Sequence, residues 1–163
     1  MAAIDLKHTT IEVHDGGTNY IEVVIGTGTF TYSERRNMEY RRNKGLLDTV
    51  REGDEEPMEV RFDFEWERLV GFGADNLEDA LSQTDTASAW ETSSADACEP
   101  YAVDIILNYN PDCVEAAVEV DDTMTFPDFR WETLDHDLSN GQISSSGQCN
   151  AKRAINGGTL RGS

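Results

Sequence analysis

The segment 58–66 alternates strictly between apolar and polar side chains, and this pattern constrains the fold more than any other feature of the sequence. Its apolar members are Met58, Val60, Phe62, Phe64 and Trp66. Because successive side chains of a strand point to opposite faces, this spacing predicts a long strand with one face in a core and the other in water. Weaker alternation predicts further strands at 10–13, 20–25, 29–34, 101–109, 129–133 and 143–149.

One segment, 75–82, changes to a helical spacing, with Leu77, Ala80 and Leu81 on one face after Asn76, a good N-cap. Turn residues at 15–18 and 139–141 join neighbouring strands into hairpins. About seven or eight antiparallel strands with one short flanking helix predict a mainly β fold, either a β-sandwich or a barrel. Without an internal repeat or low-complexity tract, we expect a single domain over residues 1–163.

The charge balance of 13 basic against 32 acidic residues gives a net charge of −19. Such a chain lacks the clustered Lys and Arg that non-specific nucleic-acid binding and docking on anionic membranes require. A hydrophobic content of 38% is more than a disordered acidic tail carries. No apolar run approaches the roughly 18 residues of a membrane span, and the first residues do not resemble a secretory signal. We therefore expect a folded protein made in the cytosol, with no membrane partner.

Residues 35–57 show little strand pattern and are expected to form a long inter-strand loop, which is usually either functional or disordered. The segment holds six of the thirteen basic residues, and acidic residues follow them. Such polarity would let one copy bind the next head to tail, a contact that builds rings or filaments. An ordinary surface loop is the alternative. The candidate self-assembly residues are Arg35, Arg36, Arg41, Arg42, Lys44, Arg51, Glu52, Asp54, Glu55 and Glu56.

No group of residues makes a convincing catalytic or metal site. The tripeptide 135–137 places His136 between two aspartates, but neighbours on a strand point to opposite faces and no GxSxG motif is present. A zinc site of His136 with Cys98, Cys113 and Cys149 has no support from their spacing. Buried thiols, or a Cys98–Cys113 disulfide formed in an oxidising medium, are the alternatives. We predict no enzymatic activity, no cofactor and no metal.

Two further patterns also lack the spacing of known sites. The acidic clusters at 54–56 and 119–122 do not have the DxDxDG spacing of a calcium loop, so we expect solvated carboxylates. The glycines at 26 and 28 are not followed by a Lys-Ser or Lys-Thr pair, so we expect a bend between strands. A β protein with a polarised loop and no active site fits a self-assembling structural subunit.

The chain as a whole resembles the major tail protein, or tail tube protein, of long-tailed phages with non-contractile tails. The resemblance lies in a Gly-Leu-Leu-Asp turn, an acidic turn before a long alternating strand, a short helix, and a closing hairpin that ends in SGxCN. It covers about residues 11–151 in the same order. The segments that carry it are 44–66, 75–81, 87–90, 98–111 and 125–151.

The resemblance implies hexameric rings that stack into a tube around the tape measure protein and later conduct DNA into the host. It also implies a virion location after assembly in the host cytoplasm, with tail terminator and distal tail or tip proteins as further partners. In such a tube the loop 35–57 would contact the adjacent ring, and residues 1–7 and 151–163 would form arms. The basic residues of the C-terminal arm are Lys152, Arg153 and Arg161.

A tube lumen lined with carboxylates would let DNA pass without specific binding, because it repels phosphates. The candidate lumen-facing acids are those on the polar side of the alternating strand and just after it, Glu59, Asp63, Glu65 and Glu67. The alternative function is an acidic β-sandwich binding module for capsid decoration or carbohydrate binding. Its recognition residues would be Trp90, Tyr101 and Tyr109.

Overall fold

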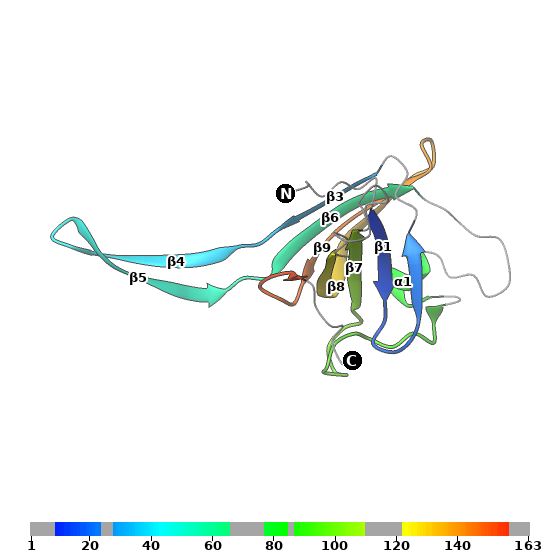
Figure 1. Ribbon diagram of the computed structural model, residues 1–163, viewed down its shortest axis with the longest axis horizontal. Coiled ribbons are helices and arrows are strands. Elements are labelled where there is room, and N and C mark those ends of the chain that lie inside the picture. Colours follow the sequence, from blue (N-terminus) through cyan, green and yellow to red (C-terminus); the bar gives the residue numbers. More distant parts are fainter. Residues whose placement is uncertain (1–8, 24–27, 66–76, 85–86, 110–121, 157–163) are drawn as a thin grey trace, which may run out of the picture.

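The computed structural model describes residues 9–23, 28–65, 77–84, 87–109 and 122–156 (Figure 1). The described part is mainly β with one short helix, α1 (Leu77–Ser82), which confirms the predicted fold class. The strands are β1 (Thr9–His14), β2 (Tyr20–Val23), β3 (Thr29–Ser33), β4 (Arg36–Asn43), β5 (Leu46–Glu55), β6 (Met58–Glu65), β7 (Val103–Tyr109), β8 (Asp122–Asp137), β9 (Gln142–Cys149) and β10 (Ile155–Asn156). No described helix is long and apolar enough to span a membrane.

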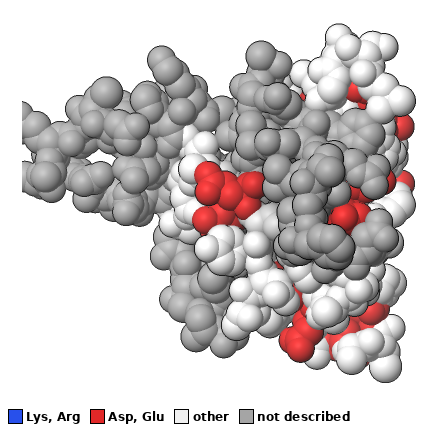
Figure 2. Space-filling view, turned by 90° about the vertical axis from the view of Figure 1, so that its right-hand side faces the viewer, with Lys and Arg blue, Asp and Glu red and all other residues white. Residues whose placement is uncertain are grey.

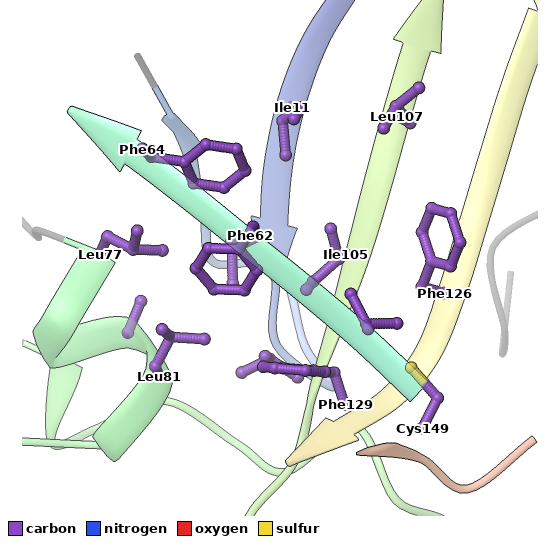
Figure 3. Close-up of a cluster of buried hydrophobic side chains, with 14 of the residues drawn as sticks. Ile11, Phe62, Phe64, Leu77, Leu81, Ile105, Leu107, Phe126, Phe129 and Cys149 are labelled. Atoms are coloured by element: carbon purple, nitrogen blue, oxygen red, sulfur yellow. The ribbon is translucent and has the colours of Figure 1, made fainter. Parts of the chain in front are cut away.

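Eight strands form one antiparallel sheet in the order β2-β1-β7-β8-β9-β6-β3, with β10 added to β8. β8, 16 residues long, joins two halves: its first part pairs with β7 and its second part with β9. Between these parts, Asp128 adopts a φ of 53°. The sheet bends there, so that β6 crosses over β7 and β8 (Figure 3). Among the described strands β2 and β3 form the two edges, so the sheet is open and not a closed barrel.

The core lies between the two halves and under α1. β6 supplies Met58, Val60, Phe62 and Phe64, all at most 4% exposed, which confirms the alternation over the described part of 58–66. The ring centroids of Phe62 and Phe64 stack 4.7 Å apart. Trp66 lies outside the described residues. On β9, Ile143 and Cys149 lie beside the side chains of β6, and the other core side chains are Ile11, Val13, Ile105, Leu107, Phe126 and Phe129, with Leu77, Ala80 and Leu81 from the helix.

Residues 35–57 form a two-stranded β-hairpin, and the prediction of a loop is wrong for this segment. β4 and β5 pair only with each other within the described structure and project from the body as a long arm (Figure 1). Lys44 and Gly45, both at positive φ, form the turn, as the turn type that suits a tight hairpin requires. Neither face of the hairpin is buried, so its sequence has no apolar alternation to reveal the strands. We call residues 36–55 the arm.

The closing hairpin is also longer than expected. The strand predicted at 129–133 spans Asp122–Asp137, because an irregularity between Trp131 and Thr133 interrupts the alternation without ending the pairing with β9. β10 was not predicted, since a two-residue strand has no period to detect. The helix and the hairpin of β1 and β2 lie where the sequence indicates, although Ile25 falls outside the described residues.

Gly147, in the SGxCN segment, lies directly against the backbone of β8 at Arg130 and Trp131. A Cβ atom at this position would meet the carbonyl oxygen of Arg130 at 2.1 Å. We therefore expect Gly147→Ala to lower the free energy of unfolding by about 2 kcal/mol or more, measured by urea denaturation. Gly141→Asn is the control, since its φ of 64° suits Asn and no other atom lies within 4 Å. Equal stability of the two variants would contradict this account of Gly147.

Candidate interaction surface

The arm exposes large apolar side chains near its tip. Leu46 and Leu47 are 73% and 72% exposed, and the cross-strand pair Tyr40 and Val50 is 66% and 52% exposed. An isolated two-stranded hairpin is marginally stable in water, so contact with a second surface would stabilise it. The charges of this segment were evident from the sequence, but its apolar tip was not; the Lys44-Gly45 turn next to Leu46 and Leu47 is the signal that could have revealed it.

The cations at the tip of the arm are available to a partner. Arg41, Arg42 and Lys44 are exposed, and none forms an ion pair with any described residue. Arg51, in contrast, pairs across the strands with Glu39. Three cations without an ion pair in the described structure therefore lie at or near the turn that ends the arm.

Two acidic residues near the base of the arm, Glu59 and Glu52, are already paired within the chain. Arg35 Nη2 and Arg61 Nη2 each lie 2.5 Å from a carboxylate oxygen of Glu59, and Lys152 pairs with Glu52. Glu52, which the sequence assigned to the acidic half of the assembly segment, therefore has a partner in its own chain. Asp54 and Glu55 are exposed, and Glu56 is half-buried.

The first residues of the expected C-terminal arm lie on the body of the same chain. Ala151 O accepts from Met58 N at 3.0 Å, Ala154 N donates to Glu34 Oε1 at 3.0 Å, and β10 pairs with β8. We call residues 150–156 the strap, because they connect β8, the start of β6 and the base of the arm. Residues 151–156 thus contact their own chain, and an arm that docks on a neighbour stays a prediction. Arg153 is exposed on the strap, and Arg161 lies outside the described residues.

The pKa of Glu52 is lowered from 4.5, first by its side-chain hydrogen bond with Lys152 and further by the charges of Lys152, Arg36 and Arg153. A carboxyl group whose pKa is lower in the folded state stabilises that state above its unfolded pKa, and the contribution is lost as the pH falls through the folded pKa. The link between strap and arm should therefore weaken in acid.

We expect Lys152→Gln to raise the pKa of Glu52 toward its ordinary value, measured by NMR titration of the side-chain carboxyl. Arg153→Gln is the matched control, because the charge of Arg153 contributes less to the shift. Amide hydrogen exchange at the base of the arm should increase in the Lys152 variant. An unchanged Glu52 titration would show that the ion pair does not hold the strap in solution.

The polar face of β6 is less acidic than the sequence alone indicated. Glu59 is neutralised by Arg35 and Arg61, and Arg61 separates it from Asp63. The Oδ1 atom of Asp63 is buried and has no hydrogen-bond partner among the described residues. The side chain of Glu65 and all of Glu67 lie outside the described part. The assignment of these four acids to a lumen stays a prediction.

The tripeptide 135–137 forms the end of β8, directly before the turn to β9. Asp137 accepts from the backbone N–H groups of Ser139 and Asn140 and from Asn140 Nδ2 at 2.8 to 3.3 Å, and these hydrogen bonds lower its pKa. His136 Nε2 lies 3.4 Å from Glu78 Oε2 on α1. The arrangement stabilises a turn.

Cys98 and Cys149 lie in different environments. Cys98 is exposed, whereas burial, together with the charges of Asp104 and Asp128, raises the pKa of the Cys149 thiol to about 12. Cys113 falls outside the described residues, so the zinc and disulfide alternatives that include it are not placed. Among the residues that the structure describes, no cluster of three or more His, Cys, Asp or Glu side chains could hold a metal ion.

These environments predict selective thiol chemistry. At pH 8 a maleimide should modify Cys98 rapidly and leave Cys149 unmodified in the folded protein, because a neutral, buried thiol is a poor nucleophile. Peptide mass spectrometry after labelling, with urea-unfolded protein as the control, measures both sites. Fast native labelling of Cys149 would show that the core around β9 opens readily.

The aromatic residues proposed for a binding module do not form an exposed platform. Trp90 is only 3% exposed, and Tyr101 is half-buried and donates from its Oη to Ala80 O at 2.8 Å. The side chain of Tyr109 lies outside the described part. The expectation that Trp90 and Tyr101 recognise a ligand at the surface is therefore wrong.

The end of the molecule opposite the arm is acidic. β1, β2 and α1 lie toward this end in Figure 1 and contain Glu12, Glu22, Glu78 and Asp79 but no Lys or Arg. Figure 2, which looks at this end, shows acidic patches among its described residues and no basic one. The long axis of the molecule thus runs from a cationic, apolar tip to an acidic end.

Comparison with solved structures finds the same fold in two large assemblies. A chain in the structure of the sheath/tube terminator of an extracellular contractile injection system, PVC, in its extended state matches with a TM-score of 0.53 and 13% identity, covering 97% of this chain and 99% of that chain. A chain in the anti-feeding prophage cap, described as a tube terminating cap, matches with a TM-score of 0.52 and 12% identity, over 98% of this chain and 93% of that chain. No family model and no curated protein sequence matches. At these identities the likeness establishes a shared fold.

Proposed function

We propose that this protein is a structural subunit of a phage tail tube or of a related injection tube, and that it assembles with copies of itself through the arm. The observation that carries the proposal is the arm itself, which projects exposed leucines and unpaired cations away from the body. The fold supports it, because both structural neighbours come from assemblies described as terminating a tube. A position within the tube and a position at its end both agree with this fold.

The distribution of charge favours head-to-tail association. The cationic tip of the arm and the acidic end with β1, β2 and α1 lie at opposite ends of the long axis (Figures 1 and 2). A contact between two different surfaces of one chain is heterologous, and it extends into rings or stacked filaments. Stacking along this axis would bring opposite charges together at each contact.

The edges of the large sheet offer a second surface, for lateral association between copies. β2 and β3 are the two edges of the large sheet, and edge strands present unpaired backbone groups to which another chain can add. We propose that these edges contribute to ring closure. The hexameric ring, the enclosed tape measure protein, and contacts with terminator and tip proteins follow from the sequence resemblance to tail tube proteins and belong to this proposal.

The sequence and the structural comparison point to two different types of tail. The sequence resembles subunits of non-contractile tails, whereas one structural neighbour comes from a contractile injection system. The net charge of −19 suits a channel through which DNA passes without binding, since phosphates are repelled. The proposal is therefore a virion or tail component in either type of apparatus, acting by assembly and not by catalysis.

Removing the apolar tip should prevent assembly without unfolding the body. We expect Leu46→Ser combined with Leu47→Ser to leave the urea unfolding midpoint unchanged, because both side chains are already exposed to water. Electron microscopy of concentrated protein, with and without a tail initiation complex, should show rings or tubes for the wild type and none for the variant.

Leu138→Ser is the matched control. Leu138 is 78% exposed at the turn between β8 and β9, away from the arm, and its loss should leave assembly intact. Assembly by the Leu46 and Leu47 variant would remove the arm from the mechanism. A wild-type protein that stays monomeric under all these conditions would refute the proposed function.

A further inference from the structure

The outer face of the second half of the sheet carries a row of cross-strand neighbours. The backbone register aligns Thr29 on β3 with Asp63 on β6, Asp63 with Ser144 on β9, and Ser144 with Asp135 on β8. Two hydroxyl groups thus alternate with two carboxylates across four adjacent strands. This row and the next one line a shallow groove of about 320 Å³; the second row is Thr31, Arg61, Ser146 and Thr133.

The two carboxylates of the groove have no cationic partner within the described part of their own chain. Neither Asp63 nor Asp135 forms an ion pair with a described residue, and Arg61 is engaged with Glu59. Asp63 Oδ1 has almost no solvent exposure and accepts no hydrogen bond within the described structure. Leaving a buried acceptor without a donor costs about 1–3 kcal/mol, more for a charged group. A cation from outside the chain, bound in the groove, would offset that cost electrostatically without touching Oδ1 itself.

The arm carries such cations but cannot reach the groove of its own chain. The arm leaves the body at the end of β3 and the start of β6, next to Ser33 and Met58. Thr29 and Asp63 lie at the other end of the same two strands, and the arm points away from them (Figure 1). β4 and β6 each have 8 residues, so the arm spans about 26 Å, the length of β6. A second copy placed along this axis brings its arm to the groove.

We propose that the groove is the receptor for the tip of the arm of a second copy, with Arg41, Arg42 and Lys44 facing Asp63 and Asp135. The inference rests on the proposed function, and it names the surface that receives the arm. Guanidinium groups suit this surface, because they bind carboxylates with two parallel hydrogen bonds and can donate further to hydroxyl oxygens. Asp63 then belongs to a subunit contact and not to a lumen.

The test is assembly of charge variants, measured by sedimentation velocity and electron microscopy. We expect Asp63→Asn with Asp135→Asn to raise the concentration needed for assembly by about tenfold or more, as close charge pairs at interfaces do. Glu91→Gln with Asp96→Asn, two exposed carboxylates in the segment before β7 and outside both the groove and the acidic end, is the control with the same charge change and should assemble as the wild type does. Circular dichroism and urea unfolding establish that each variant is folded.

A charge swap makes the test specific. Asp63→Lys with Asp135→Lys should block assembly, as should Arg41→Glu with Arg42→Glu, and combining all four changes in one chain should restore it. Zero-length carbodiimide cross-linking of mixed ¹⁴N and ¹⁵N protein should join Lys44 of one copy to Asp63 or Asp135 of another.

The outcomes separate the two proposals. If the wild type assembles while the groove variants assemble equally well, or if Lys44 is cross-linked to carboxylates elsewhere, the docking site is refuted and the proposed function stands. If the wild type does not assemble at all, the proposed function fails and the docking site fails with it. Restoration by the charge swap supports both.

Discussion

The bend in β8 is the constraint on which the rest of the structure depends. β8 pairs with β7 before the bend and with β9 after it, and Asp128 at the bend is 2% exposed. Its N–H donates to Asp104 Oδ1 at 2.9 Å, its carboxylate accepts from Ser93 Oγ at 3.0 Å, and its carbonyl accepts from Asn150 N at 3.2 Å. These bonds satisfy polar groups that would otherwise be costly in a core. Without the bend, the two halves could not enclose Phe62, Phe64 and their neighbours.

The same bend determines where the interaction surfaces lie. It directs β9, β6 and β3 across the first half of the sheet, so their inner face is buried and their outer face carries the hydroxyl and carboxylate rows. The arm continues from the ends of β3 and β6, and the strap holds its base through Lys152 and Glu34. Arm, groove and core are therefore parts of one framework, and a change at the bend would move the arm relative to the groove.

Most strands with a buried face were predicted from the sequence, whereas the arm, which is exposed on both faces, was not. β6 was predicted well because Phe62 and Phe64 face the core while Arg61 and Asp63 face outward. The arm was predicted as a loop because both of its faces are in water. Neither face requires apolar residues, so its sequence shows no alternation of apolar and polar side chains. β7 was predicted as well, although Asp104 and Ile106 are buried along with Ile105, because its apolar residues still recur at every second position.

The candidate site was predicted in its charges but not in its geometry. The cations Arg41, Arg42 and Lys44 could be located from the sequence, because they lie close together within one segment. The sequence alone could not show that Glu52 and Glu59 are neutralised by Lys152 and Arg35, because those pairs join segments far apart in the sequence. The row of Asp63 and Asp135 also needs the register of three strands, β6, β9 and β8, which no single segment encodes.

The distribution of charge explains why a long arm suits an acidic protein. Copies with a net charge of −19 repel one another over distances comparable to the Debye length, about 8–10 Å at physiological salt. An arm of about 26 Å carries its cations beyond that distance, so they meet a neighbour's carboxylates before the two bodies are close. Screening by salt weakens both the repulsion and the attraction between exposed charges. Contact of the exposed leucines is much less affected, so the apolar tip would hold the assembly together once the charges have aligned it.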